Sequence, residues 1–141
     1  MAPQPPGPPL AAKLGVKEGH RLALIGAPAG WTVEGLPAGA RVLRRPTPDL
    51  DVAVAFFRRL ADLHHDVERL AGTITPAGAL WLAWPRRAAG HESDITDESV
   101  RQAALPLGLV DVKVAALGQD WSGLKFVWRK ELRAARRVPR T

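Results

Sequence analysis

The sequence contains no cysteine among its 141 residues. This absence excludes disulfide bonds, thiolate metal sites and a cysteine nucleophile. The apolar runs are strand-sized and stay far below the roughly 18 residues of a membrane-spanning helix. The first ten residues, MAPQPPGPPL, have neither a basic nor an apolar segment and do not resemble a secretory signal. We therefore expect a cytoplasmic protein with no membrane contact.

Common catalytic and metal-binding motifs are also missing. The sequence has neither a P-loop nor a Gly-x-Ser-x-Gly nucleophile elbow. His64 and His65 are adjacent, so on a helix their side chains diverge by roughly 100°. Such a pair does not readily chelate one metal ion. We interpret both histidines as solvated or capping residues and predict no metal site.

One polar segment, His91-Glu92-Ser93-Asp94, places an imidazole, two carboxylates and a hydroxyl within four residues. Held in a cleft, such a group can perform acid–base chemistry. A hydrophilic loop that leads to the next helix explains the same residues more simply. We assign no catalytic residue from the sequence.

Positive charge is in excess, with 20 Lys and Arg against 14 Asp and Glu. Six of these cations lie after residue 128, so most of the excess lies at the C-terminal end of the chain, which includes a basic tail, residues 131–141. A solvated tail is favoured over a nucleic-acid surface. Residues 1–9 contain five prolines and are predicted to be a disordered lead-in. One domain, residues 10–130, remains.

Apolar runs and turn residues divide this domain into strands and helices. The final two strands are joined by a short glycine-bearing link, and this short link predicts an antiparallel hairpin. The preceding alternation of strands and helices predicts parallel strands with right-handed crossovers. The fold class is therefore α/β: a Rossmann-like three-layer sandwich with a mostly parallel sheet of about six strands ending in an antiparallel hairpin. The predicted strands are 20–26, 40–44, 51–57, 78–85, 109–117 and 124–129, and the predicted helices are 9–14, 58–71 and 96–105.

The strand at 78–85 ends in a candidate site. Its six consecutive apolar residues are typical of a strand buried on both faces. Trp84 and Pro85 close it, and Arg86 and Arg87 follow. In open parallel sheets ligands sit at the carboxyl edge, where arginine binds carboxylates and phosphates and tryptophan offers an aromatic face. Alternatively, the tryptophan seals the core and the arginines point into water.

A glycine-bearing turn, residues 26–30, closes the first strand at the same edge. Followed by a helix, it would form a phosphate-binding corner. A tight turn that needs two glycines for its backbone is the alternative. The hairpin link is expected at this edge too. The candidate ligand-binding residues are those of the turn, the strand end and the link: Gly26, Pro28, Gly30, Trp84, Arg86, Arg87, Trp121 and Ser122.

The order of elements resembles a shortened class I methyltransferase. Residues 22–30 resemble that family's first strand and glycine-rich loop, and residues 73–80 resemble the approach to a later strand. The sequence departs from the family's cofactor contacts at three places. Pro28 stands in the glycine loop, Leu24 stands where the family favours an acid, and Arg44 and Arg45 stand where a carboxylate would bind ribose. The resemblance therefore does not imply binding of S-adenosylmethionine in the usual mode.

A closer resemblance is to a small bacterial Rossmann-like family catalogued as a domain of unknown function. This resemblance implies no activity. It extends over nearly the whole chain and rests on residues 9–15, 26–28, 80–85, 105–114 and 121–127.

These observations lead to two hypotheses about function. In the first, the protein binds a small anionic ligand or a partner protein at the carboxyl edge of its sheet, without catalysis. In the second, it is a degenerate S-adenosylmethionine-dependent methyltransferase-like enzyme. A third interpretation, nucleic-acid contact through the basic tail, is disfavoured. The sequence leaves the cofactor and the oligomeric state open.

Overall fold

The computed structural model describes residues 8–87 and 90–134. Most of the predicted lead-in, residues 1–7, and most of the predicted basic tail, residues 135–141, lie outside these ranges. The helices are α1 (Leu10–Leu14), α2 (Leu60–Ala71), α3 (Asp97–Ala104), the 3-10 helix η2 (Leu105–Leu107) and α4 (Lys130–Arg133). The strands are β1 (Arg21–Ile25), β2 (Arg41–Leu43), β3 (Leu50–Phe56), β4 (Ile74–Pro85), β5 (Leu109–Ala116) and β6 (Trp121–Trp128).

These six strands form one sheet in the order β2-β1-β3-β4-β6-β5. The first four in that order are parallel to one another. Strand β6 is antiparallel to both β4 and β5. The predicted fold class, a mostly parallel sheet that ends in an antiparallel hairpin, is thereby confirmed.

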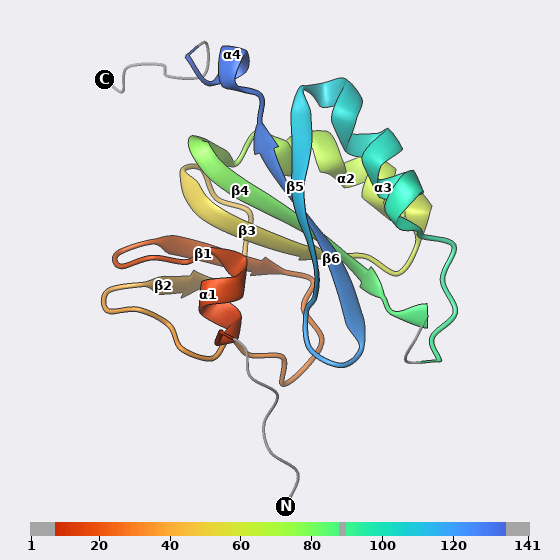
Figure 1. Cartoon of the computed structure of the whole chain (residues 1–141), viewed down its shortest axis with the longest axis horizontal. Coiled ribbons are helices and arrows are strands. Elements are labelled where there is room, and N and C mark those ends of the chain that lie inside the picture. Colours follow the sequence, from red (N-terminus) through yellow and green to blue (C-terminus); the bar gives the residue numbers. More distant parts are fainter. Residues whose placement is uncertain (1–7, 88–89, 135–141) are drawn as a thin grey trace, which may run out of the picture.

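The described helices cover the two faces of the sheet unequally. Helices α2 and α3 lie side by side against one face, and α1 lies against the other (Figure 1). Each face has its own hydrophobic cluster, and alternate residues of β3 and β4 point into one or the other. The segment from Ala79 to Trp84 is buried throughout, as expected for a strand covered on both sides.

Short α1 is fixed to the sheet by one buried hydrogen bond. The indole Nε1 of Trp81 in β4 donates to the carbonyl of Leu14 at 3.0 Å. Gly15 ends the helix in the left-handed conformation, with φ of 87°. A five-residue helix has little stability of its own, so its position depends on this hydrogen bond together with the burial of Ala11 and Leu14.

Strand β4 begins four residues before its predicted start. The segment Pro76-Ala77-Gly78 suggested a break, but the strand continues through it with an irregular register against β3. A Cβ on Gly78 would lie 2.9 Å from the carbonyl oxygen of Leu50. Glycine therefore permits the close backbone approach at this bulge.

No helix follows the turn at residues 26–30. The described residues 27–40 run without a helix or strand to β2. The phosphate-binding corner considered from the sequence is therefore not formed. A Cβ on Gly26 would lie 3.2 Å from the carbonyl of Phe56, and the residue has a positive φ of 72°. The backbone explanation for this glycine is supported.

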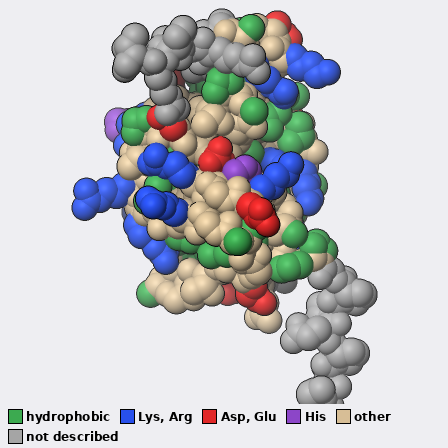
Figure 2. Space-filling model, turned by 90° about the vertical axis from the view of Figure 1, so that its left-hand side faces the viewer, with side chains coloured by type: hydrophobic (Ala, Val, Ile, Leu, Met, Phe, Trp, Pro, Cys, Tyr) green, Lys and Arg blue, Asp and Glu red, His purple; other side chains and the backbone are tan. Residues whose placement is uncertain are grey.

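The amino ends of the parallel strands form the edge opposite the candidate site. On this side Lys and Arg side chains stand on both flanks, and acidic and histidine side chains lie between them (Figure 2). The two signs of charge are therefore interspersed at this edge.

Candidate ligand site

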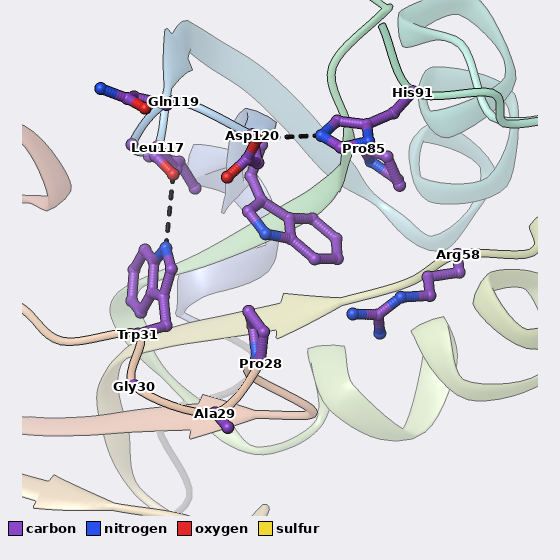
Figure 3. A pocket seen from close by; sticks show the side chains of 12 residues that line it. Pro28, Ala29, Gly30, Trp31, Arg58, Pro85, His91, Leu117, Gln119 and Asp120 are labelled. Atoms are coloured by element: carbon purple, nitrogen blue, oxygen red, sulfur yellow. Dashed lines mark hydrogen bonds and ion pairs between the residues drawn. The ribbon is translucent and has the colours of Figure 1, made fainter. Parts of the chain in front are cut away.

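A cavity of about 410 Å³ opens at the carboxyl edge of the sheet, between the turn after β1 and the link from β5 to β6. Its volume falls in the range of small-molecule sites. Figure 3 shows Trp31 on one side and Arg58 on the other, with its guanidinium directed inward. The cavity is lined by Pro28, Ala29, Gly30, Trp31, Arg58, Pro85, His91, Leu117, Gly118, Gln119, Asp120 and Trp121.

The two tryptophans that line this cavity, Trp31 and Trp121, form a continuous edge-to-face series with Phe56. Trp31 contacts Phe56 with ring centroids 4.8 Å apart, and Phe56 contacts Trp121 at 5.0 Å. The indole Nε1 of Trp31 donates to the carbonyl of Leu117 at 3.4 Å. Phe56 and Trp121 are nearly completely buried, so they support the half-buried Trp31, whose ring can stack against a planar ligand.

Arg58 contributes a positive charge to this surface. It follows the end of β3, and its guanidinium carbon lies 5.0 Å from the ring centroid of Trp121. No carboxylate of the described residues pairs with Arg58. An arginine held by a ring keeps its N–H donors free for an anion.

An imidazole–carboxylate pair stands on the opposite side of the cavity from the turn. His91 Nε2 lies 2.9 Å from Asp120 Oδ1, and both side chains are exposed. The two loops are joined again where the Arg86 amide donates to the carbonyl of Asp120 at 2.8 Å. Arg86 Nη1 also donates to the carbonyl of Gln119 at 3.1 Å. The loop after β4 and the hairpin link thus form one connected wall.

The rest of the polar segment at 91–94 has a local structural role. Asp94 accepts a hydrogen bond from the Leu60 amide at 3.0 Å, at the first turn of α2. Ser93 Oγ accepts from the Ile95 amide at 3.1 Å. The sequence-based acid–base group is therefore divided, and only His91 faces the cavity.

The structure distributes the eight predicted site residues over three cavities. Pro28, Gly30 and Trp121 line the cavity described above. Gly26 lines a second cavity of about 450 Å³ with Arg58, Arg59 and residues of α2. A third cavity, of about 340 Å³, lies beside the start of α3 and is lined by Trp84, Arg86, Arg87, Ile95, Thr96, Asp97 and Ser122.

The prediction that Trp84 and Trp121 meet at one site is therefore wrong. In the register between β4 and β6, Trp84 is opposite Ser122 and Pro85 is opposite Trp121. Successive residues of a strand point to opposite faces. Trp84 consequently packs in the cluster under α2 and α3, whereas Trp121 packs in the cluster under α1.

Sequence reasoning missed nine of the twelve residues that line the first cavity, among them Trp31, Arg58, Asp120, and His91 as its partner. Two of them carried a usable signal. Arg58 follows the predicted third strand directly, as Arg86 follows the fourth, and Asp120 precedes Trp121 in the hairpin link. The pairing of His91 with Asp120 depends on the sheet order and had no local signal.

Residues 8–87 and 90–134 show neither a metal-binding cluster nor a membrane-spanning helix. These residues contain no group of three or more His, Asp or Glu side chains placed to hold a metal ion. Over the same ranges, no helix has both the length and the apolar composition needed to cross a bilayer.

Comparison with solved structures identifies relatives in fold. A SAM-dependent methyltransferase from Aquifex aeolicus aligns with 82% of this chain and 85% of its own, with a TM-score of 0.53 and 16% identity. A TehB-like SAM-dependent methyltransferase from Corynebacterium glutamicum covers 84% and 85%, with a TM-score of 0.56 and 10% identity. Aeropyrum pernix fibrillarin, in complex with natively bound S-adenosyl-L-methionine, covers 84% and 73%, with a TM-score of 0.56 and 14% identity.

In sequence, no protein-family model and no curated protein matches this chain. The resemblance to a bacterial family of unknown function stays a prediction. Identities this low show a shared fold and nothing finer. The chain therefore has the α/β Rossmann-like fold of SAM-dependent methyltransferases.

Proposed function

We propose that the protein is methyltransferase-like and binds an S-adenosyl compound in the 410 Å³ cavity, through contacts that differ from the usual ones. One observation carries the proposal. In a methyltransferase fold, a cavity with aromatic walls and an unpaired arginine opens beside the turn after β1. Ligands of doubly wound sheets bind at this carboxyl edge.

The usual cofactor contacts do not fit this chain. Leu24 stands in the place of the acid and is only 2% exposed. Arg44 and Arg45 follow the end of β2, where a carboxylate would bind ribose hydroxyls. Pro28 has no amide hydrogen to donate in the turn.

The cavity offers different partners for the same chemical groups. Trp31 presents a ring for a purine, Arg58 a cation for a carboxylate, and Asp120 an acceptor for hydroxyl or amino groups. S-adenosylmethionine, when bound, supplies an electrophilic methyl group. If His91 Nε2 donates to Asp120, its Nδ1 retains a lone pair that can accept a proton from a nucleophile.

The first prediction is that the protein binds S-adenosyl compounds, and calorimetric titration with S-adenosylmethionine and S-adenosylhomocysteine tests it. We expect binding of both, with S-adenosylhomocysteine at least as tight, because it lacks the sulfonium charge that Arg58 repels. Arg58→Gln should weaken binding roughly tenfold, since it removes one charged hydrogen-bonding partner. Arg59→Gln is the matched control, because Arg59 does not line this cavity. No heat at millimolar ligand would exclude the proposal.

A second candidate function, binding of a small anion, is favoured by the arginines of the third cavity. Arg87 Nη2 donates to the carbonyl of Ser93 at 3.4 Å, and Arg86 donates to Gln119. Neither pairs with a carboxylate among the described residues. Both therefore retain charge for a ligand beside the start of α3.

Two substitutions separate binding from packing in this cavity. Arg87→Ala should abolish binding of anions such as inorganic phosphate here and leave the unfolding free energy almost unchanged, since an exposed guanidinium contributes little to folding. Trp84→Ala should destabilise the protein by about 3 kcal/mol, because its ring is buried under α2 and α3. Urea denaturation and phosphate titration measure the two effects. Loss of stability in Arg87→Ala would show that the residue is structural.

A further inference from the structure

Four lysines gather on the face of the sheet that carries α1: Lys13 of α1, Lys17 just after it, Lys113 of β5 and Lys125 of β6. We call them the lysine cluster. Lys113 and Lys125 are opposite each other across the hairpin. Lys125 extends to α1, because a Cβ on Gly15 would lie 3.0 Å from its Nζ. None of the four lines any of the three cavities.

Backbone carbonyls hold two of these side chains in place. Lys113 Nζ donates to the carbonyl of Lys13 at 3.3 Å. Lys13 Nζ donates to the carbonyl of Ala116, at the end of β5, at 3.1 Å. The end of α1 and the hairpin thus fix ammonium groups from two directions.

No ion pair of the described residues neutralises a lysine of the cluster. The ion pairs of the described residues involve Arg69, His91 and Arg101, and none includes a lysine. Residues 1–7, 88–89 and 135–141 contain no Asp or Glu in their sequence. Every acidic side chain therefore belongs to the described part of the chain, and none of the ion pairs found there includes a lysine of the cluster.

The charges in the cluster also repel one another. Burial lowers the pKa of Lys125, and the charges of Lys113 and Lys17 lower it further. A half-buried cation beside like charges destabilises the folded state unless something compensates for it. A bound anion would remove both the repulsion and part of the desolvation cost.

We infer that the lysine cluster is a binding site for a small ligand carrying two or more phosphoryl groups. Ammonium groups are compact point charges that suit phosphate oxygens, whereas planar carboxylates favour the fork of arginine. Four lysines from three segments can contact more than one phosphoryl group. The neighbouring tryptophan, Trp81, is fully buried. It offers no face for stacking a base, which argues against single-stranded nucleic acid.

Titration of the protein with sodium tripolyphosphate tests this site. At low ionic strength we expect saturable binding that weakens as salt is added. Lys113→Gln and Lys125→Met should each weaken it roughly tenfold, since each removes one charged hydrogen-bond donor. Arg69→Gln is the matched control: it also removes one positive charge, but from the exposed surface of α2. We expect its affinity within about twofold of the original.

The outcomes that would overturn the inference are distinct. Equal weakening by Arg69→Gln and Lys113→Gln would show a response to net charge alone. Tighter binding of a single-stranded oligonucleotide than of tripolyphosphate would assign the surface to nucleic acid. Unchanged binding in both lysine variants would place the ligand elsewhere, and loss in Arg87→Ala would locate it in the third cavity. Lys113 is exposed, so its variant keeps the test valid if Lys125→Met does not fold.

Discussion

At the scale of single residues, the protonation of Lys125 makes the free energy of unfolding depend on pH. In the unfolded chain its pKa returns to the ordinary lysine value of 10.5, whereas burial and two neighbouring lysines lower it in the fold. Between these two pKa values the unfolded chain binds more protons than the folded one. The free energy of unfolding contributed by this residue therefore rises with pH through that window.

Lys125→Met should consequently be more stable than the original protein at neutral pH. Methionine retains the aliphatic packing of the lysine stem and removes the buried charge. The stability difference should shrink as the pH approaches 10.5, where the original lysine loses its proton in both states. Urea denaturation at several pH values measures it. A difference independent of pH would contradict the assigned cause.

Residue types alone led to the prediction of a site at the carboxyl edge, but they did not identify the residues that share a cavity. Gly30, Pro28 and Trp121 do line one cavity together. Trp84 does not, because its partner in the register is Ser122. That register joins segments 38 residues apart and depends on the turn between β5 and β6. A shift by one residue would have placed Trp84 and Trp121 on the same face.

At the scale of elements, apolar runs located all six strands and both longer helices. The predicted boundaries of the strands were wrong where glycine or proline lies inside a strand. Strand β4 continues through Pro76 and Gly78, and β6 includes Gly123. At Gly123 a Cβ would meet the Leu117 side chain at 2.6 Å. These glycines permit close packing rather than a turn, a distinction that requires the tertiary structure.

The beginning of α3 was predicted correctly and gives an element-scale test. Thr96 Oγ1 accepts from the Ser99 amide at 3.1 Å, and Ser99 Oγ accepts from the Thr96 amide at 2.8 Å. Thr96→Ala should lower the unfolding free energy by about 1 kcal/mol, because it leaves an amide of the first turn without its partner. Thr96→Ser retains the hydroxyl and should be close to the original. Equal loss in both variants, measured by urea denaturation, would show that the methyl group matters instead.

At the scale of the whole molecule, the fold positions the three cavities described above and a charged surface around one sheet. The parallel strands and the final antiparallel hairpin could be predicted from the alternation of elements. The division of the cavities between the two faces of the sheet could not be predicted from the sequence. It results from the unequal helix cover, with α2 and α3 on one side and α1 on the other.

Among the described residues, strand β5 lies at a border of the sheet and pairs with a strand on one side only, so its outer backbone groups can pair with another chain. Val112 and Val114 on this strand are 54% and 62% exposed, so the border is also apolar. A register irregularity between Asp111 and Lys113 interrupts the regular ladder there, and the lysine adds a charge. Both features oppose edge-to-edge aggregation. The lysine proposed to hold phosphate therefore also opposes pairing of this edge with a second chain.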